Sequence, residues 1–323
     1  MAGRKIPPWM VSWKQPSQTE SKIAGNHPPN DGRILEMQPM RILFTSDLHG
    51  RRNLYDELFT LAADRDIQVI LLGGDLLPHH GPFQETVVEQ EEFVFSYLQP
   101  ALQNFRNRRS QVRIYTLLGN NDWSESDKVM AKIEEQGLVE ALDGKRLDLD
   151  ERYQMIGYGN VNPTPFRIKD RERLDYPGDE VPANMRGCYR SQGHKVVAVV
   201  PETHYRGHLS MVEELEGLPL PVAGRKLISV IHSPPWGTGL DVMEGGAHVG
   251  SRAVRDYLQR WRPCLALHGH IHEAPEESGT WIEHLGPTVC VNPGQSWEQL
   301  HAVMFDLGDV PGEFEHTVYG KPL

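Results

Sequence analysis

Residues 41–50 read RILFTSDLHG, a short apolar run that ends directly at Asp47 and His49. Residues 67–75 read IQVILLGGD and repeat the arrangement, with Asp75 after the apolar run. Short runs rich in branched apolar residues are typical of strands. The two stretches therefore predict two strands that end at carboxylate and imidazole groups.

A helical pattern separates these two strands. Leu54, Leu58 and Leu61 recur at a spacing of three and four residues, which indicates a helix that buries one face. Strand, helix and strand in this order are typical of a βαβ unit, so we expect an α/β fold. Further strands are predicted at 112–118, 196–200, 227–231, 265–267, 281–285, 289–291 and 302–305, and further helices at 86–106, 125–136 and 251–261.

Three segments interrupt the alternation. Pro100 is expected to kink or divide the helix at 86–106, because proline cannot donate the helical hydrogen bond. Asp143-Gly144 is a strong signal for a two-residue hairpin between antiparallel strands at 138–142 and 146–149. Residues 160–192 are rich in Pro, Gly, Arg and Asp and have no period, which indicates a surface excursion in a position to overhang a site.

The sequence divides into an N-terminal extension and one domain. Residues 1–38 lack a continuous apolar segment and carry five prolines, so we expect a flexible N-terminal extension without a typical secretory signal. We interpret residues 39–323 as one domain with a mixed sheet or two packed sheets. The hydrophobic content of 39% supports a core. Because no run approaches the ~20 apolar residues of a membrane-spanning helix, we expect no membrane association.

Charge and cysteine usage narrow the partners and the compartment. The formal net charge of −11 disfavours broad contact with nucleic-acid backbone but still allows a small or locally captured phosphate ligand. The three cysteines have no CxxC spacing, which indicates neither a disulfide framework nor a cysteine zinc site. We therefore expect a cytoplasmic protein.

Five predicted strands run directly into groups that bind metals. After the first two strands, YTLLGNND reaches Asn120, ISVIHSPP reaches His232, and LALHGHIH reaches His270 and His272. Ligands in open α/β sheets bind outside the carboxyl ends of the strands, so we expect these side chains to converge. Glycines beside them permit sharp turns and a close approach of the backbone to an ion.

Together these motifs resemble those of the calcineurin-like metallophosphoesterase superfamily, which are, in order, DxH, GGD or GD, GNH followed by an acid, a lone histidine, and GHxH. The resemblance covers about residues 40–307. It implies a sandwich of two mixed β-sheets flanked by helices, and it implies a metal-dependent phosphoesterase. The matching positions are Asp47-Leu48-His49, Gly73-Gly74-Asp75, Gly119-Asn120-Asn121-Asp122, His232 and Gly269-His270-Ile271-His272.

The resemblance also implies a set of metal ligands. One metal would be bound by Asp47, His49, Asp75 and His272, and the other by Asp75, Asn120, His232 and His270. Asp75 would bridge the two ions, and a hydroxide between them would attack the phosphate ester. Oxygen donors combined with imidazoles suit two divalent ions of Mn, Fe, Zn or Mg. The implied catalytic residues are Asp75, Asn120 and Asn121.

The chain departs from the family pattern at one position. Asn121 stands where the family usually has a histidine that protonates the leaving oxygen or stabilises the phosphate. An asparagine donates hydrogen bonds but cannot act as that acid. We therefore expect a preference for phosphodiesters or for esters with good leaving groups.

Each motif also has an ordinary structural interpretation when it is taken alone. Asp47 fits a helix cap, and Asp75 and Asn120 fit turns. His232 fits a hydrogen-bonded core position, and we assign His268 a structural role because the motif begins one residue later. Only the five motifs together favour metal binding.

Four neighbouring side chains have two interpretations. His79 and His80 follow Asp75 on a loop, where they either reach the substrate or remain solvated. Arg51 and Arg52 follow the first motif, where they either steer a phosphate or start a solvated helix.

The leading functional hypothesis is a hydrolase that cleaves phosphodiesters or phosphomonoesters of a soluble compound. A protein phosphatase is a second enzymatic hypothesis. A metal-bound scaffold with weak turnover is the alternative from another class, and the intact set of predicted ligands argues against it.

Overall fold

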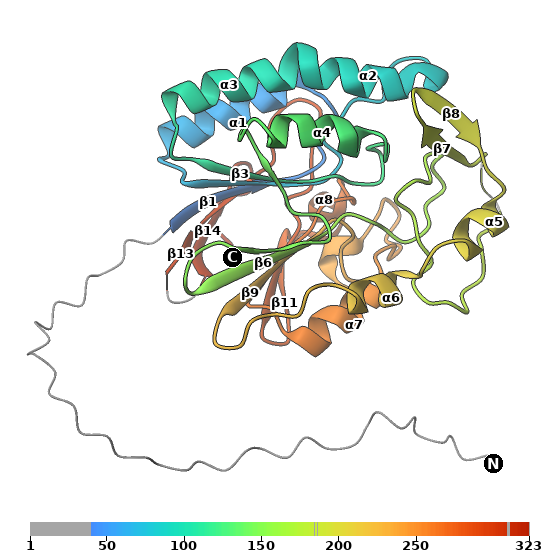
Figure 1. The fold of residues 1–323 in the computed structure, drawn as a ribbon. Helices are drawn as coiled ribbons and strands as arrows, with labels where there is room; N and C mark the ends of the chain where they lie inside the picture. Colours follow the sequence, from blue (N-terminus) through green and yellow to red (C-terminus); the bar gives the residue numbers. More distant parts are fainter. Residues whose placement is uncertain (1–39, 184, 186, 309–310, 323) are drawn as a thin grey trace, which may run out of the picture. The chain divides into compact units, whose positions relative to one another are not determined.

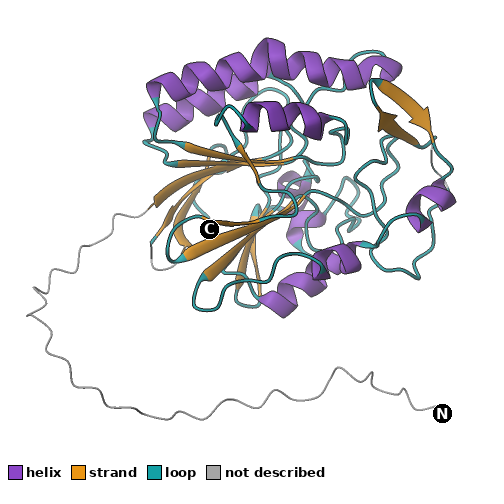
Figure 2. Ribbon diagram, in the orientation of Figure 1, coloured by secondary structure: helices purple, strands orange, loops and turns teal. Residues whose placement is uncertain are grey.

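In the computed structural model, residues 40–183, 185, 187–308 and 311–322 are described. The predicted N-terminal extension at 1–38 lies outside these residues. The described chain is an α/β structure in which two mixed six-stranded sheets are flanked by helices (Figure 1 and Figure 2).

The first sheet is built around the strands predicted to carry the first motifs. Its strand order is β14-β13-β1-β2-β3-β4, in which β1 to β4 are parallel and β13 and β14 are antiparallel to their neighbours. The carboxyl ends of β1, β2 and β3 therefore lie at one edge. The strands are β1 (Met40–Thr45), β2 (Val69–Gly73), β3 (Arg113–Leu117), β4 (Glu140–Ala141), β13 (Val303–Leu307) and β14 (Pro311–His316).

The second sheet has the order β11-β12-β10-β9-β6-β5, with parallel pairing from β6 through β9 and β10 to β12. Its two outer strands, β5 and β11, are antiparallel to their neighbours. The strands are β5 (Arg146–Asp148), β6 (Tyr153–Tyr158), β9 (Lys226–Ile231), β10 (Leu265–Leu267), β11 (Ile282–Leu285) and β12 (Thr288–Val291).

Both faces of the central strands are buried, which explains their continuous apolar sequences. Ile42 and Phe44 pack in the core that also contains Leu265 and Leu267 of β10, so this core joins the two sheets. Leu43, between them, points the other way into the core beneath the helices.

Helices cover the outer face of each sheet. In Figure 1, α1 to α4 lie over the first sheet, and α6 and α7 lie beside the second. The bounds are α1 (Arg52–Asp64), α2 (Thr86–Phe93), α3 (Gln99–Arg108), α4 (Ser126–Glu134), α5 (Pro201–Arg206), α6 (Met211–Glu216), α7 (Arg252–Trp261) and α8 (Ala274–Ser278). Ser251 fixes the start of α7, because its hydroxyl accepts the main-chain N–H of Val254 at 3.1 Å.

The helix predicted at 86–106 is divided, but just before Pro100 rather than at it. A π-helical turn at Val94–Leu98 separates α2 from α3, and Pro100 lies in the first turn of α3. The π-helical turn thus directly precedes the position at which proline cannot donate a helical hydrogen bond.

The hairpin predicted around Asp143-Gly144 is wrong. β4 pairs with β3 in the first sheet, whereas β5 pairs with β6 in the second sheet. The turn therefore carries the chain from one sheet to the other. An Asp-Gly pair supplies the positive φ that a tight turn needs, and Gly144 has φ 67°, but this does not make the flanking strands partners.

The segment at 160–192 leaves the second sheet after β6. Most of it has no regular structure, and it ends in β7 (Tyr189–Gln192), which pairs with β8 (Lys195–Ala198) in a separate two-stranded sheet. Figure 1 shows β7 and β8 beyond the end of α2.

Candidate metal centre

The side chains predicted as ligands follow the carboxyl ends of β1, β2, β3, β9 and β10. Four of these residues adopt the left-handed region, with φ of 60° at Asp47, 43° at His49, 52° at Asp75 and 69° at His270. Such a conformation costs a non-glycine residue about 1–3 kcal/mol. These four residues lie at three strand ends, and strain that clusters in this way is typical of functional sites.

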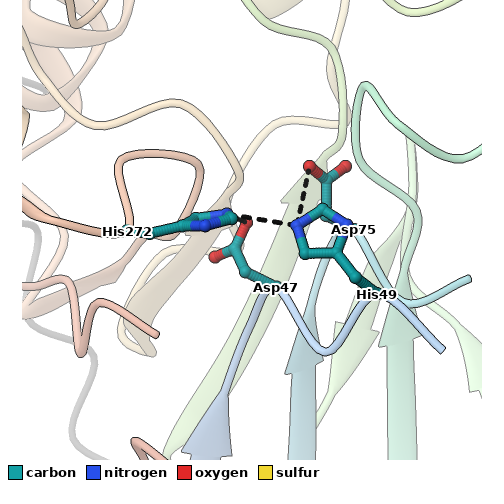
Figure 3. A group of neighbouring side chains, drawn as sticks. All are labelled: Asp47, His49, Asp75 and His272. Atoms are coloured by element: carbon teal, nitrogen blue, oxygen red, sulfur yellow. Dashed lines mark hydrogen bonds and ion pairs between the residues drawn. The ribbon is translucent and has the colours of Figure 1, made fainter. Parts of the chain in front are cut away.

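The first group contains Asp47, His49, Asp75 and His272, whose ligand atoms all lie within 4.8 Å of one another (Figure 3). His272 Nε2 lies 3.1 Å from His49 Nε2 and 3.1 Å from Asp47 Oδ1. His49 Nε2 lies 3.9 Å from Asp75 Oδ2. Three loops from two sheets thus point their donor atoms at one small volume.

The second group contains Asp75, His232 and His270, again within 4.8 Å. His232 Nε2 lies 3.4 Å from Asp75 Oδ1 and 3.9 Å from Asp47 Oδ1. Asp75 belongs to both groups and presents one carboxylate oxygen to each. This is the arrangement in which a carboxylate bridges two ions.

Asn120 lies beside these groups and is fully buried. Among the described residues, neither its side-chain oxygen nor its nitrogen has a hydrogen-bond partner. Leaving buried polar atoms unpaired is costly, and native structures rarely do so without a reason. Unpaired oxygen and nitrogen donors beside two ionised carboxylates fit the needs of a divalent cation.

Glycines allow the strand ends to approach so closely. A Cβ added to Gly119 would lie 2.4 Å from Asp75 Oδ1 and 2.5 Å from His232 Nε2. A Cβ on Gly269 would lie 2.4 Å from Asp47 Oδ2. Any larger residue at these two positions would displace the candidate ligands.

Electrostatics favour the ligand forms of several side chains. Burial lowers the pKa of His49 and of His270 to about 3, so both imidazoles are neutral at pH 7. Burial alone would raise the pKa of Asp75, but His232 and His49 hold it well below its usual value. Burial would lower the pKa of His232, but the negative charge of Asp75 and its hydrogen bond outweigh this effect and raise the pKa to about 9. His232 must therefore release a proton to bind a metal.

Asp122 connects two of the loops that carry candidate ligands, a role that the sequence analysis did not assign. Its carboxylate accepts the main-chain N–H groups of Gly119, Leu76 and Leu77 at 2.8–3.1 Å, which ties the loop after β3 to the loop after β2. Burial and the charge of Asp75 raise its pKa to about 7. Its place as the last residue of GNND was the available signal.

Asn121 contacts the shared carboxylate directly. Its main-chain N–H donates to Asp75 Oδ1 at 2.8 Å, and its Nδ2 donates to Asp75 Oδ2 at 2.6 Å. The side chain is a hydrogen-bond donor and carries no titratable proton. In this chain, Asn121 therefore holds Asp75 in place from the position at which the family usually has a histidine.

Of the residues in the loops beside the site, His79 and the Arg51–Trp297 pair lie near His49, whereas Arg52 points toward the helices. The ring of His79 packs 4.9 Å from that of His49, while Arg51 stacks 4.0 Å above Trp297. Trp297 in turn lies 5.6 Å from His49. Arg52 instead stacks on Tyr97, which belongs to the helical layer.

His268 has the structural role that the sequence suggested. Its Nδ1 lies 2.8 Å from the carbonyl oxygen of Ile231 and 3.1 Å from that of Ser233, on either side of His232. Burial lowers its pKa to about 4, so the ring is neutral at pH 7 and donates its Nδ1–H to these carbonyl oxygens. His268 thus fixes the backbone that presents His232.

We expect His268→Leu to lower the free energy of unfolding of the metal-free protein by about 1–3 kcal/mol, because two buried carbonyls lose a donor. It should also weaken metal binding by about 10–100-fold, as loss of a group that orients a ligand does. Urea unfolding and metal titration measure the two effects. The exposed His284→Leu is the control. A fall in metal stoichiometry at saturation would mean that His268 is itself a ligand.

The fold and the clustered side chains define an α/β sandwich with a candidate dimetal site of buried aspartates and histidines. A model of the calcineurin-like phosphoesterase family matches residues 40–274. The chain belongs to that family. The predicted family and fold class are therefore confirmed.

Two solved structures with TM-scores above 0.5 agree with this fold. One has 18% identity and a TM-score of 0.57, and the match covers 86% of this chain and 99% of that one. TT1561 of Thermus thermophilus has 18% identity and a TM-score of 0.51, with 86% and 98% covered. A dimetal phosphatase from Danio rerio has 9% identity and a TM-score of 0.47, with 88% and 100% covered. No curated protein matches the sequence.

Within the described part of the chain, no helix is both long and apolar enough to span a bilayer.

Proposed function

We propose that this protein is a binuclear metal-dependent hydrolase that cleaves phosphate esters of small molecules. The observation that carries the proposal is the sharing of Asp75 by two buried groups of donor atoms. The family assignment supports phosphoester chemistry.

In this proposal, each metal has four ligands, and Asp75 serves both. Asp47, His49, Asp75 and His272 bind one ion, and Asp75, Asn120, His232 and His270 bind the other. Two divalent ions held by such ligands supply a deprotonated water at neutral pH and neutralise charge on the phosphate oxygens. Manganese is the metal to test first, because mixed oxygen and imidazole donors suit it.

The protein's own side chains would position the reaction. Asn121 holds Asp75 through two hydrogen bonds. The buried amide of Asn120 adds an uncharged ligand beside it, so the second site carries less negative charge than two carboxylates would give. His49 and His270, both neutral, bind without adding positive charge that would repel the ions.

Two further features complete the proposal. Cys188, Cys264 and Cys290 are free thiols, which supports action in the cytoplasm. We also propose that residues 39–323 act as a single catalytic domain.

The test is to strip the full-length protein with a chelator, restore Mn²⁺, and measure hydrolysis of bis(p-nitrophenyl) phosphate and p-nitrophenyl phosphate. We expect turnover that depends on the metal and is faster for the diester. Turnover of phosphopeptides but of neither small ester would favour a protein phosphatase. If the protein binds no divalent metal, the proposal is wrong.

A further inference from the structure

A cavity of about 560 Å³ adjoins the candidate metal centre. Asn121 and His79 form the wall nearest the metal centre, and both contact candidate ligands. A second wall comes from the excursion and includes Phe166 and Arg167, and Phe83 also lines the cavity. The surface excursion at 160–192 thus reaches the candidate site.

The cavity presents an aromatic ring and a flat cation. Phe166 is 51% exposed, although it is a large apolar residue. The Arg167 guanidinium lies 3.6 Å above the centroid of the Phe83 ring and 4.9 Å from that of Tyr189. With the described residues it makes no hydrogen bond or ion pair, so its N–H donors are free for a ligand.

Buried polar contacts hold this wall in place. Asp170 accepts the main-chain N–H of Ser124 at 2.9 Å and that of Ser191 at 3.1 Å. Ser124 lies three residues after Asn121, so this contact joins the excursion to the loop that touches Asp75. The wall therefore has a fixed position beside the metal centre.

Buried Lys169 fixes the other side of the same loop. Its Nζ donates to the carbonyl oxygen of Thr164 at 2.9 Å and to both carboxylate oxygens of Glu172 at 2.9–3.0 Å. Both partners are fully buried, so removal of either one would leave an uncompensated buried charge. The hydrogen bond from Lys169 to Thr164 therefore ties together the two ends of the turn at Pro165–Arg167.

We propose that this cavity binds the organic group of the substrate, and that this group is a flat aromatic ring without positive charge. The inference rests on the proposed function, in which the metals bind the phosphoryl group. Aromatic rings stack on both phenylalanine and guanidinium faces. The charge of Arg167 disfavours a cationic group. The substrate class is therefore a phosphate ester whose organic group carries such a ring.

The test measures binding, so that it does not depend on turnover. Mn²⁺-loaded full-length protein is titrated calorimetrically with methylphosphonate, phenylphosphonate and 2-carboxyethylphosphonate, in which only the organic group differs. We expect phenylphosphonate to bind at least about tenfold more tightly than methylphosphonate, because the ring buries apolar surface in the cavity.

Two variants localise the effect. Phe166→Ala and Arg167→Gln should each reduce the preference for phenylphosphonate to about threefold or less, because each removes one stacking surface. Both residues are exposed, so neither change should prevent folding. Leu220→Ala is the matched control, since Leu220 is also exposed but precedes the amino end of β9.

The outcomes separate this inference from the proposed function. Equal affinities, tighter binding of 2-carboxyethylphosphonate, no binding of any phosphonate, or an unchanged preference in both variants would overturn the inference. None of these results would contradict the proposed function, which is tested separately by metal-dependent hydrolysis of the diester. Conversely, a preference for phenyl that Phe166→Ala removes, in a protein without turnover, would support the binding site and sink the proposed function.

Discussion

Replacing Asp75 with asparagine should reduce metal-dependent hydrolysis of bis(p-nitrophenyl) phosphate by far more than 100-fold. Even groups that only orient a ligand cost about 10–100-fold when removed, and Asp75 presents an oxygen to both groups of donors. Asparagine keeps the size but loses the charge and one carboxylate oxygen. Initial rates at saturating Mn²⁺, together with metal content after dialysis, measure the effect.

Asp64→Asn is the matched control, because Asp64 is an exposed aspartate at the end of α1. It should retain full activity and metal content. An Asp75→Asn protein that keeps two bound ions and a rate within tenfold of the wild type would contradict the bridging role.

Replacing Asn121 with histidine should accelerate hydrolysis of esters with poor leaving groups by about 100-fold or more, the usual range for a positioned general acid. Asn121 contacts Asp75, so a histidine at this position would lie beside the reacting phosphate. Esters of p-nitrophenol should gain little, because that leaving group departs without a proton. The variant should therefore have the smaller dependence of rate on leaving-group pKa.

A series of aryl and alkyl phosphodiesters, measured in parallel with both proteins, gives the two slopes. Asn121→Gln serves as the control for altered size without a titratable group. Identical slopes for wild type and Asn121→His would show that the missing histidine does not determine the leaving-group preference.

The sequence predicted the central strands and the convergence of their ends because both follow from local signals. Apolar runs such as 41–45 and 227–231 are long enough to identify strands, and a polar group directly after a parallel strand has only one edge at which to lie. The seven predicted ligands are thus brought to neighbouring strand ends. Their roles as ligands remain a prediction.

Other features depend on tertiary contacts that no local pattern records. β6 was not predicted, although Tyr153–Tyr158 is buried throughout, because Gln154 and Gly157 interrupt its apolar run. Gln154 is accommodated by hydrogen bonds to the carbonyl oxygens of Val222 and Arg225. The wall formed by Phe166 and Arg167 was equally unreadable, since buried Lys169 and Asp170 rather than a helix or strand set its position.

The division of the candidate ligands between two sheets has a thermodynamic consequence. His49 and His272 are 223 residues apart in sequence, yet their Nε2 atoms lie 3.1 Å from each other. An unfolded chain would have to close that whole loop to offer both imidazoles to one ion, at a large cost in chain entropy. An ion bound there would act as a reversible cross-link between the first and second halves of the molecule. At a free metal concentration 100 times its dissociation constant, one such ion would add about 2.7 kcal/mol to the free energy of unfolding.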